Sequence, residues 1–246
     1  MIEIFNTALY QPLYNALIFL VDILPGGSVG FAVIILTIFI KFILFPLSHK
    51  SVTTQAKMRS LDKNIKQIRE ENKNNKQEEA KKIMELYKEH GLNPFSGCLL
   101  LLVQLPIIFA LYWVFLKGVV ISPELLYSFV PIPEKLNTIF LGFIDMHGKS
   151  VIVALLAGIT QFYQMRLSMP PLPDMPKAKE RSFKDELARS MNIQMRYIMP
   201  IIVAIISYTI SSAVALYWMT SNIWGIGHEL LVKRKAMKII ENSEKQ

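Results

Sequence analysis

A single lysine inside the first long apolar segment constrains what this chain can be. Residues 28–45 read SVGFAVIILTIFIKFILF, and Lys41 is the only charged residue among them. An ammonium group in hydrocarbon costs roughly 2.5–3.5 kcal/mol on insertion scales and more than about 10 kcal/mol in some simulations. A chain that keeps such a lysine either lets it reach water or uses its charge.

The apolar residues are concentrated in blocks, which is typical of membrane spans. The chain has 246 residues, of which 52% are hydrophobic, and its mean hydropathy is +0.35. Cys98 is the only cysteine, which excludes an intrachain disulfide and argues against a cysteine-based metal site. The first 27 residues contain no Lys or Arg, so no cleavable signal with a positive n-region is predicted.

A helix needs about 20 apolar residues to cross a bilayer. Five segments meet or approach this length: 28–48, 97–117, 149–168, 196–211 and 213–231. The predicted fold class is therefore an all-α integral membrane protein with a bundle of five transmembrane helices. Residues 10–24 are shorter and interrupted by polar residues. We interpret them as an interfacial helix within an extracytoplasmic arm, residues 1–27, with Asn15 and Asp22 on its wet side.

The basic residues predict the orientation of these spans. Of the 27 Lys and Arg residues, 23 lie in or beside three alternate segments, 49–96, 169–195 and 232–246. The positive-inside rule then places a helical hairpin (49–96), a loop (169–195) and the tail (232–246) in the cytosol. It places the N-terminus and the loop 118–148 outside.

The hairpin prediction rests on two apolar stripes with helical spacing. The stripes consist of Met58, Leu61, Ile65 and Ile68, and of Ala80, Ile83, Met84 and Tyr87. The polar run 70–76 separates them. Eleven basic and seven acidic residues surround the stripes, so the hairpin is either a solvated element beside lipid headgroups or a docking surface for a partner.

Each predicted span carries polar residues, and the only acidic residue within the five is Glu229, near the end of the last span. These polar residues include Thr37 and Ser48 beside Lys41, Gln104, Gln161, Gln164, Ser207, Tyr217, Trp218 and Asn222. Such residues often act as packing contacts between helices, worth about 0.6 kcal/mol on average, and Tyr217 and Trp218 are also typical of interfacial anchors. Lys41 itself lies about 10 Å from the cytosolic end of its span, close enough to snorkel part of the way. Otherwise water or a visiting anion must solvate it.

Catalytic motifs give little support to an enzyme. Gly26-Gly27-Ser28-Val29-Gly30 matches G-x-S-x-G, but a nucleophile elbow requires a strand–turn–helix context, whereas Ser28 opens a predicted span. The chain contains no HExxH, P-loop or dinucleotide-binding motif. We therefore predict no enzyme activity, cofactor or metal.

Four segments resemble the YidC/Oxa/Alb family of membrane protein insertases. They are KFILFPLSHKS, GLNPFSGCLLLLVQLPIIFALYWV, LLAGITQFYQMRLSMP and MRYIMPIIVAIISYTISSAVALYWMTSNIWGIGHELL. The resemblance runs from about Tyr10 to Lys233. Many bacterial members carry Arg where this chain has Lys41, and Lys keeps the charge but loses the bidentate fork. This chain is similar to a short form without the large periplasmic domain of Gram-negative members.

The resemblance implies a five-span core around a hydrophilic groove that is open to cytosol and lipid. It implies that Lys41 supplies the groove's cation, with Gln161 and Trp218 also lining it. We expect Gln104, Ser207 and Asn222 to keep the groove wet. A flexible hairpin that recruits substrate is also implied, for which the candidate residues are Arg59, Lys63, Glu70 and Lys81.

The implied function is insertion and folding of integral membrane proteins in the bacterial plasma (inner) membrane without nucleotide hydrolysis. The implied partners are nascent membrane proteins and lipids. The Sec translocon, the signal recognition particle receptor and the ribosome are further candidates, and no direct nucleic-acid contact is expected. Two other classes stay open. One is an anion channel or secondary transporter with Lys41 as its selectivity charge. The other is a structural partner or assembly chaperone of a translocon, in which Lys41 only snorkels.

Overall fold

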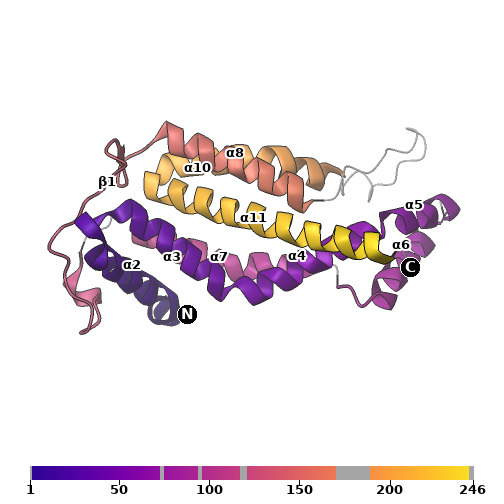
Figure 1. The fold of residues 1–246 in the computed structure, drawn as a ribbon, viewed down its shortest axis with the longest axis horizontal. Coiled ribbons are helices and arrows are strands. Elements are labelled where there is room, and N and C mark those ends of the chain that lie inside the picture. The colour runs from indigo at the N-terminus through magenta and orange to yellow at the C-terminus, as the bar shows by residue number, and fades with distance from the viewer. Residues whose placement is uncertain (1, 73–74, 94–95, 117–120, 170–188, 244–246) are drawn as a thin grey trace. The chain divides into compact units, whose positions relative to one another are not determined.

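The structure, a computed structural model, describes residues 2–72, 75–93, 96–116, 121–169 and 189–243. Most of the predicted loop 169–195 and the last residues of the tail lie outside this part. The described chain is largely helical (Figure 1). It divides into two compact units. Unit 1 comprises Met1–Ile43 and Gln104–Ile226, and unit 2 comprises Leu44–Val103 and Gly227–Gln246.

Unit 1 is built from helices and one short hairpin, and α7 and α11 continue from it into unit 2. Its elements are α1 (Ile2–Phe5), η1 (Asn6–Tyr10), α2 (Gln11–Ile23), η2 (Pro25–Gly27), α3 (Val29–Ile43), α7 (Ser96–Leu116), η3 (Pro123–Leu125), β1 (Ile139–Phe140), β2 (Ile144–Asp145), α8 (Val151–Ser168), η5 (Gln194–Ile198), α10 (Met199–Ile210) and α11 (Ser212–Ser243). Unit 2 adds α4 (Phe45–Ser60), α5 (Asp62–Glu71) and α6 (Lys76–Glu89).

The first predicted span is interrupted. α3 ends at Ile43 and α4 begins at Phe45, so no single helix covers residues 28–48. Pro46 lies in the first turn of α4. Proline has no backbone N–H, and its ring collides with the carbonyl four residues earlier, so a continuous helix through Pro46 is unfavourable.

The N-terminal helix is longer and less solvated than the sequence pattern indicates. The helix continues upstream of residue 10, and the stretch Glu3–Ile23 is long and apolar enough to cross a membrane. The interfacial placement of residues 10–24 stays a prediction. Asn15 was expected on the wet side but is only 3% exposed. Its amide donates to the carbonyl of Leu125 at 2.8 Å, and its oxygen accepts from the N–H of Tyr127 at 2.8 Å. The reason is that a loop, rather than water, covers this face of α2.

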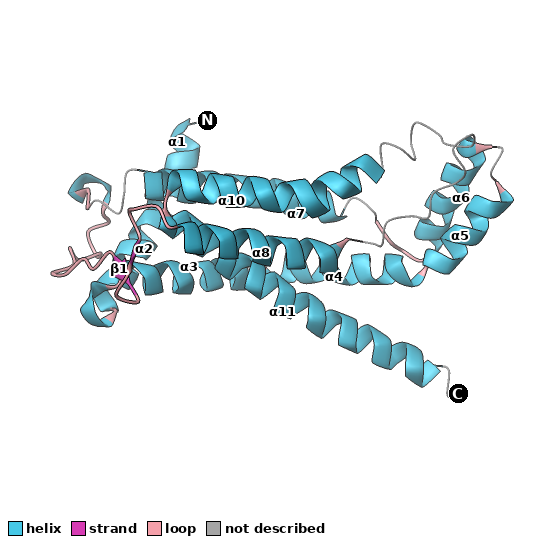
Figure 2. Cartoon of the chain, turned by 90° about the horizontal axis from the view of Figure 1, so that it is seen from above, coloured by secondary structure: helices cyan, strands magenta, loops and turns pink. Residues whose placement is uncertain are grey.

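Two helix pairs form the body of unit 1. In the first, α2 packs against α3 (Figure 1), and Leu17, Ile18 and Val29 are fully buried. In the second, α8 and α10 lie side by side (Figure 2). Gly158 allows their close approach, because a Cβ there would lie 2.9 Å from the Cβ of Ala204.

The loop 121–148 is tied to the helix ends by backbone hydrogen bonds. The N–H of Asn137 donates to Gly27, and the carbonyl of Asn137 accepts from Val29 at the start of α3, at 2.9 and 3.0 Å. The N–H of Ser212 at the start of α11 donates to Gly148 at 2.8 Å. The bonds donated by Val29 and Ser212 satisfy N-terminal helix donors that have no partner within their own helix.

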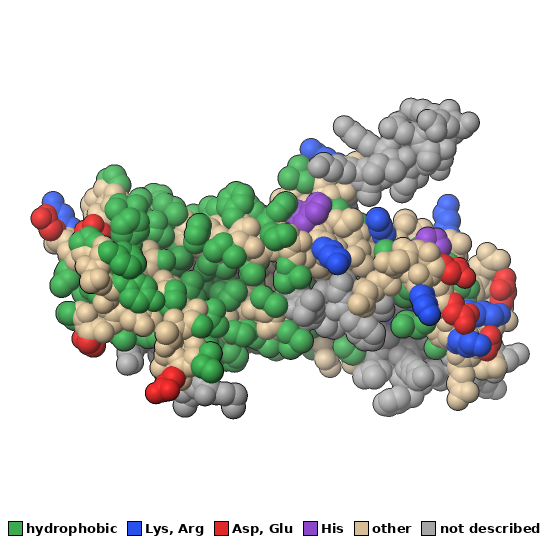
Figure 3. Space-filling model, turned by 90° about the horizontal axis from the view of Figure 1, so that it is seen from below, with side chains coloured by type: hydrophobic (Ala, Val, Ile, Leu, Met, Phe, Trp, Pro, Cys, Tyr) green, Lys and Arg blue, Asp and Glu red, His purple; other side chains and the backbone are tan. Residues whose placement is uncertain are grey.

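Among the described residues, three helices are long and apolar enough to cross a membrane. They are Glu3–Ile23, Val151–Ser168 and Arg189–Ile210, with α3 and α4 together as a fourth if the broken pair forms one span. Leu102–Phe115 within α7 is a shorter apolar helix. Large hydrophobic side chains cover much of one face (Figure 3). The structure thus supports a multi-span membrane protein, and the count of five spans stays a prediction.

Unit 2 contains a small apolar cluster between α5 and α6. Leu61, Ile65 and Leu92 are buried, with Ile83 and Tyr87 packed against them. Members of both predicted stripes therefore meet, but Met84 is 48% exposed. The first stripe is also divided, because α4 ends at Ser60 and α5 begins only at Asp62.

Candidate functional site

Lys41 lies in a chain of three polar side chains from α3, α7 and α11. The Nζ of Lys41 donates to Oε1 of Gln104 over 3.5 Å, which is a long hydrogen bond. The Nε2 of Gln104 in turn donates to the hydroxyl of Tyr217 over 2.5 Å. Both ends of one amide are therefore used, and three helices far apart in the sequence meet at this point.

The positive charge of Lys41 has a neutral partner. None of the ion pairs between described residues involves Lys41. An ammonium group has three N–H donors, and one amide oxygen satisfies only one of them without balancing the charge. Gln104 thus contributes to the solvation of this lysine. That water or a visiting anion solvates the rest of the ammonium group stays a prediction.

Tyr217 is part of this arrangement rather than an interfacial anchor. Its side chain is 4% exposed, and its hydroxyl receives the hydrogen bond from Gln104. Buried tyrosines usually find a partner for the hydroxyl, and here the partner is a side chain on another helix. The sequence shows the aromatic but not its partner, since the rotation of α11 decides which residues it faces.

A second group of polar side chains joins α8 to α11. The Nδ2 of Asn222 donates to the carbonyl of Ala157 and to the hydroxyl of Thr160, both over 3.3 Å. One turn further along, Gly225 accommodates Gln164, because a Cβ at Gly225 would lie 2.4 Å from Nε2 of Gln164. Thr160 and Gly225 had not been assigned to the site, and the four-residue spacing of Thr160 and Gln164 on one helix face was the available signal.

The remaining predicted groove residues in the spans do not all lie in one polar surface. Gln161 on α8 and Ser207 on α10 are buried, with 9% and 1% of their surface exposed. The hydroxyl of Ser207 has no hydrogen-bond partner among the described residues. Neither residue joins the hydrogen-bonded chain of Lys41, Gln104 and Tyr217.

Trp218 lines a cavity whose walls are apolar. The cavity has a volume of about 240 Å³ and lies between α7, α10 and α11. Its lining side chains are Ile108, Phe109, Leu111, Tyr112, Phe115, Ile206, Ile210, Val214, Tyr217 and Trp218. This space suits hydrocarbon rather than charge, so the hydrophilic groove remains a prediction.

The four candidate residues of the hairpin differ in their surroundings. Lys63 and Glu70 on α5 and Lys81 on α6 are exposed. Arg59 on α4 is half-buried, and its Nη2 lies 3.5 Å from Oε1 of Glu229, a buried carboxylate on α11. Arg59 therefore has an ion-pair partner within unit 2 that the sequence pattern did not indicate.

A pair of histidines beside this ion pair was also not predicted. The Nδ1 of His49 on α4 and the Nε2 of His228 on α11 are 3.0 Å apart. The ring of Phe45 stacks near both, with centroids 5.4 Å from His49 and 5.0 Å from His228. Together with Arg59 and Glu229, these contacts join α4 to the second half of α11.

Comparison with known proteins identifies the family. Residues 20–239 match the family described as "60Kd inner membrane protein". Proteins named "Membrane protein insertase YidC" from three strains of Francisella tularensis are similar to this chain: subsp. novicida U112, subsp. tularensis SCHU S4 and subsp. holarctica LVS. Each is 33% identical over 208 residues, which cover 85% of this chain and 33% of the relative. The chain thus spans about a third of the length of these curated relatives. Because the family match covers most of the chain, the protein belongs to the 60Kd inner membrane protein family, the YidC/Oxa/Alb family that its motifs resemble.

Proposed function

We propose that this protein inserts small or weakly charged membrane proteins into the bilayer and helps them fold, without hydrolysing nucleotide. The relatives named as insertases support the activity. The observation that carries the mechanism is the uncompensated charge of Lys41, whose partner in the structure is the neutral amide of Gln104. A fixed cation without a fixed anion suits a guest that brings negative charge.

The attraction is large enough to matter. A carboxylate about 4 Å from Lys41 gains roughly 4 kcal/mol at an effective dielectric of 20. That free energy corresponds to about a thousandfold in an equilibrium constant. An acidic substrate tail would therefore be drawn to α3, and the 3.5 Å bond to Gln104 is long enough to yield to a charged acceptor.

The other polar side chains have a supporting role in this proposal. Polar groups that could bind the substrate's polar segment lie on α8, α10 and α11, at Gln161, Ser207 and Asn222. On α11, Trp218 adds an aromatic surface. The apolar segment of the substrate then partitions into lipid, which makes release favourable. Lys63, Glu70 and Lys81, exposed on α5 and α6, meet the substrate first, while Arg59 keeps its pairing with Glu229.

The proposed partners follow from this activity. They are nascent membrane proteins and membrane lipids, with the Sec translocon, the signal recognition particle receptor and the ribosome as candidates for delivery. The proposed location is the bacterial inner membrane, with the N-terminus outside and the C-terminus in the cytosol.

The test is a charge series at Lys41. Lys41→Arg, Lys41→Gln and Lys41→Glu variants are reconstituted in proteoliposomes, and insertion of a single-span substrate with an acidic N-terminal tail is measured by protease protection. Arg should retain insertion, Gln should reduce it and Glu should abolish it. Lys149→Gln is the matched control, since it removes an exposed lysine that lies 5.9 Å from the ring of Tyr208.

A second substrate, with its acidic tail residues changed to amides, should lose its dependence on Lys41. If all three variants insert the acidic substrate as well as the unmodified protein, the electrostatic mechanism is wrong. Anion flux through the same liposomes that disappears in Lys41→Glu would instead support the channel alternative.

A further inference from the structure

A short hairpin at one end of unit 1 directs large apolar side chains outward. Its strands β1 and β2 are antiparallel, and Phe140 pairs with Ile144. The turn between them contains Leu141 and Phe143, which are 61% and 68% exposed. Residues 139–144 read IFLGFI and include no polar or charged side chain.

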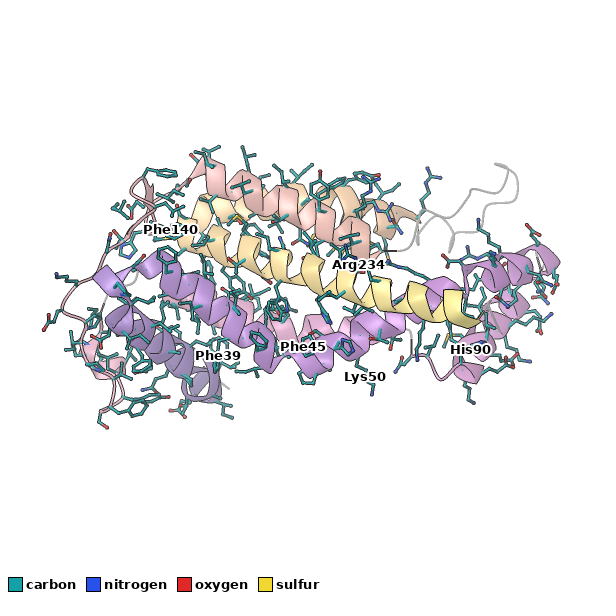
Figure 4. The ribbon with its side chains drawn as sticks, viewed as in Figure 1. Phe39, Phe45, Lys50, His90, Phe140 and Arg234 are labelled. Carbon is teal, nitrogen blue, oxygen red and sulfur yellow. The ribbon has the colours of Figure 1, made fainter. Side chains whose placement is uncertain are left out.

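The base of this hairpin is packed against α3. Phe140, which is labelled in Figure 4, is 7% exposed. Its ring centroid lies 5.2 Å from that of Phe31. Gly30 makes room for it, because a Cβ at Gly30 would lie only 2.2 Å from Cδ2 of Phe140. Ile144 and Met146 are also buried. The outward direction of Leu141 and Phe143 is therefore set by a firmly packed base.

The backbone at the turn is unfavourable for the residue that occupies it. Leu141 has φ +54°, and Gly142 has φ +83°. Hairpin turns with two positive φ angles strongly favour Asn-Gly or Gly-Gly, because a bulky side chain is disfavoured in the left-handed region. The leucine side chain at this unfavourable position points to a role for it outside the fold.

We propose that the tip of this hairpin, Leu141–Gly142–Phe143, inserts into the lipid leaflet at the end of the spans that the charge pattern assigns to the outside. Its apolar surface continues onto helix residues that also face outward, namely Phe31 on α3 and Val151 and Ile152 on α8, which are 48%, 56% and 59% exposed. An apolar surface that adjoins membrane-facing helices is more stable in contact with acyl chains than in contact with water.

The position of the hairpin in the chain supports this occupant. Its base contacts the first turn of α3, and the chain reaches α8 only six residues after β2 ends at Asp145. The tip therefore lies at the level where these helices begin. The polar residues of the segment are Asp145, which ends the second strand, and His147 and Lys149, which follow it. All three are exposed, as expected for groups at a lipid–water boundary.

Collision accessibility of a spin label tests the proposal. Cys98 is replaced by Ser, Phe143→Cys is introduced and labelled with a nitroxide, and the protein is reconstituted in vesicles of phosphatidylcholine and phosphatidylglycerol. Glu134→Cys, at an exposed charged position of the same loop, is the matched control. Leu141→Cys provides a second tip position in case Phe143→Cys does not reconstitute.

The expected result is loss of collisions with a water-soluble nickel chelate at position 143, together with high collisions with oxygen, while position 134 keeps its collisions with nickel. Equal collisions with nickel at 143 and 134 would place the tip in water and overturn the proposal. Low collisions with both reagents at 143 would mean that protein, such as a second copy of the chain, covers the tip, and this would overturn it as well.

Discussion

Removing the hydroxyl of Tyr217 should weaken the packing of α7 against α11. In Tyr217→Phe, the Nε2 of Gln104 loses the acceptor to which it donates over 2.5 Å. Tyr217 is 4% exposed, so water cannot easily replace the hydroxyl. A buried donor left without a partner costs about 1–3 kcal/mol in water-soluble proteins. Interhelical side-chain bonds in membrane proteins are weaker, about 0.6 kcal/mol on average and about 1.7 kcal/mol at most.

A double-mutant cycle isolates this contribution. Gln104→Leu alone removes both the partner of Tyr217 and the acceptor of Lys41, so single variants mix two effects. The coupling free energy between Gln104→Leu and Tyr217→Phe should be about 0.6–1.7 kcal/mol. It is measured from reversible unfolding in mixed micelles of mild detergent and dodecyl sulfate.

The control is Tyr163→Phe, which removes a hydroxyl from a side chain that is 53% exposed on α8. It should change the free energy of unfolding by less than about 0.5 kcal/mol. A coupling near zero between positions 104 and 217 would show that the amide does not bridge α7 and α11. Tyr217 would then not hold Gln104 in place beside Lys41.

Two further predictions concern the loop connections and the hairpin of unit 2. Gly27→Ala should destabilise the protein more than Gly26→Ala. Both glycines have positive φ, but only at Gly27 would a Cβ meet a backbone oxygen of the loop 121–148, at 2.0 Å. The free energy of unfolding in detergent measures the difference between the two variants. Burial and then the nearby charge of Asp62 raise the pKa of Tyr87 above its ordinary value. Its contribution to stability should therefore be complete below about pH 10 and be lost as the pH rises through the folded-state pKa. Asp62→Asn should lower that pKa in an absorbance titration of the phenol, and an unchanged titration would contradict the packing of α5 against α6.

The sequence predicts the helical class but not which side chains face each other across it. Hydropathy shows where apolar blocks lie, and it places Lys41, Gln104 and Tyr217 in three of them. Their hydrogen bonds depend on how each helix rotates about its axis and how deeply neighbouring helices pack, and these depend on contacts all along the helices. For the same reason, the pairing of Arg59 with Glu229 could not be derived from a count of charges.

Other differences have local causes that the sequence does contain. Pro46 lies within the first predicted span, and its missing N–H, together with the clash of its ring with the carbonyl four residues earlier, favours a helix boundary before it. Asn15 is different, because the amphipathic pattern assumes that a polar side chain faces water. Here the backbone groups of Leu125 and Tyr127 take the place of water, and the pattern has no means of recognising a loop that folds back over a helix.

The basic residues of the proposed insertion pathway differ in how strongly each would attract an acidic substrate, because their surroundings differ. A carboxylate about 4 Å from an exposed lysine such as Lys63 gains only about 1 kcal/mol, because water screens the pair. The same approach to Lys41, which is partly buried and has a neutral partner, gains roughly 4 kcal/mol. Arg59 offers less than either, since Glu229 already balances its charge. In the proposed mechanism, weak contacts of the substrate with α5 and α6 are released quickly, and the stronger attraction acts at α3. This is the order that transfer of a substrate from cytosol to membrane would require.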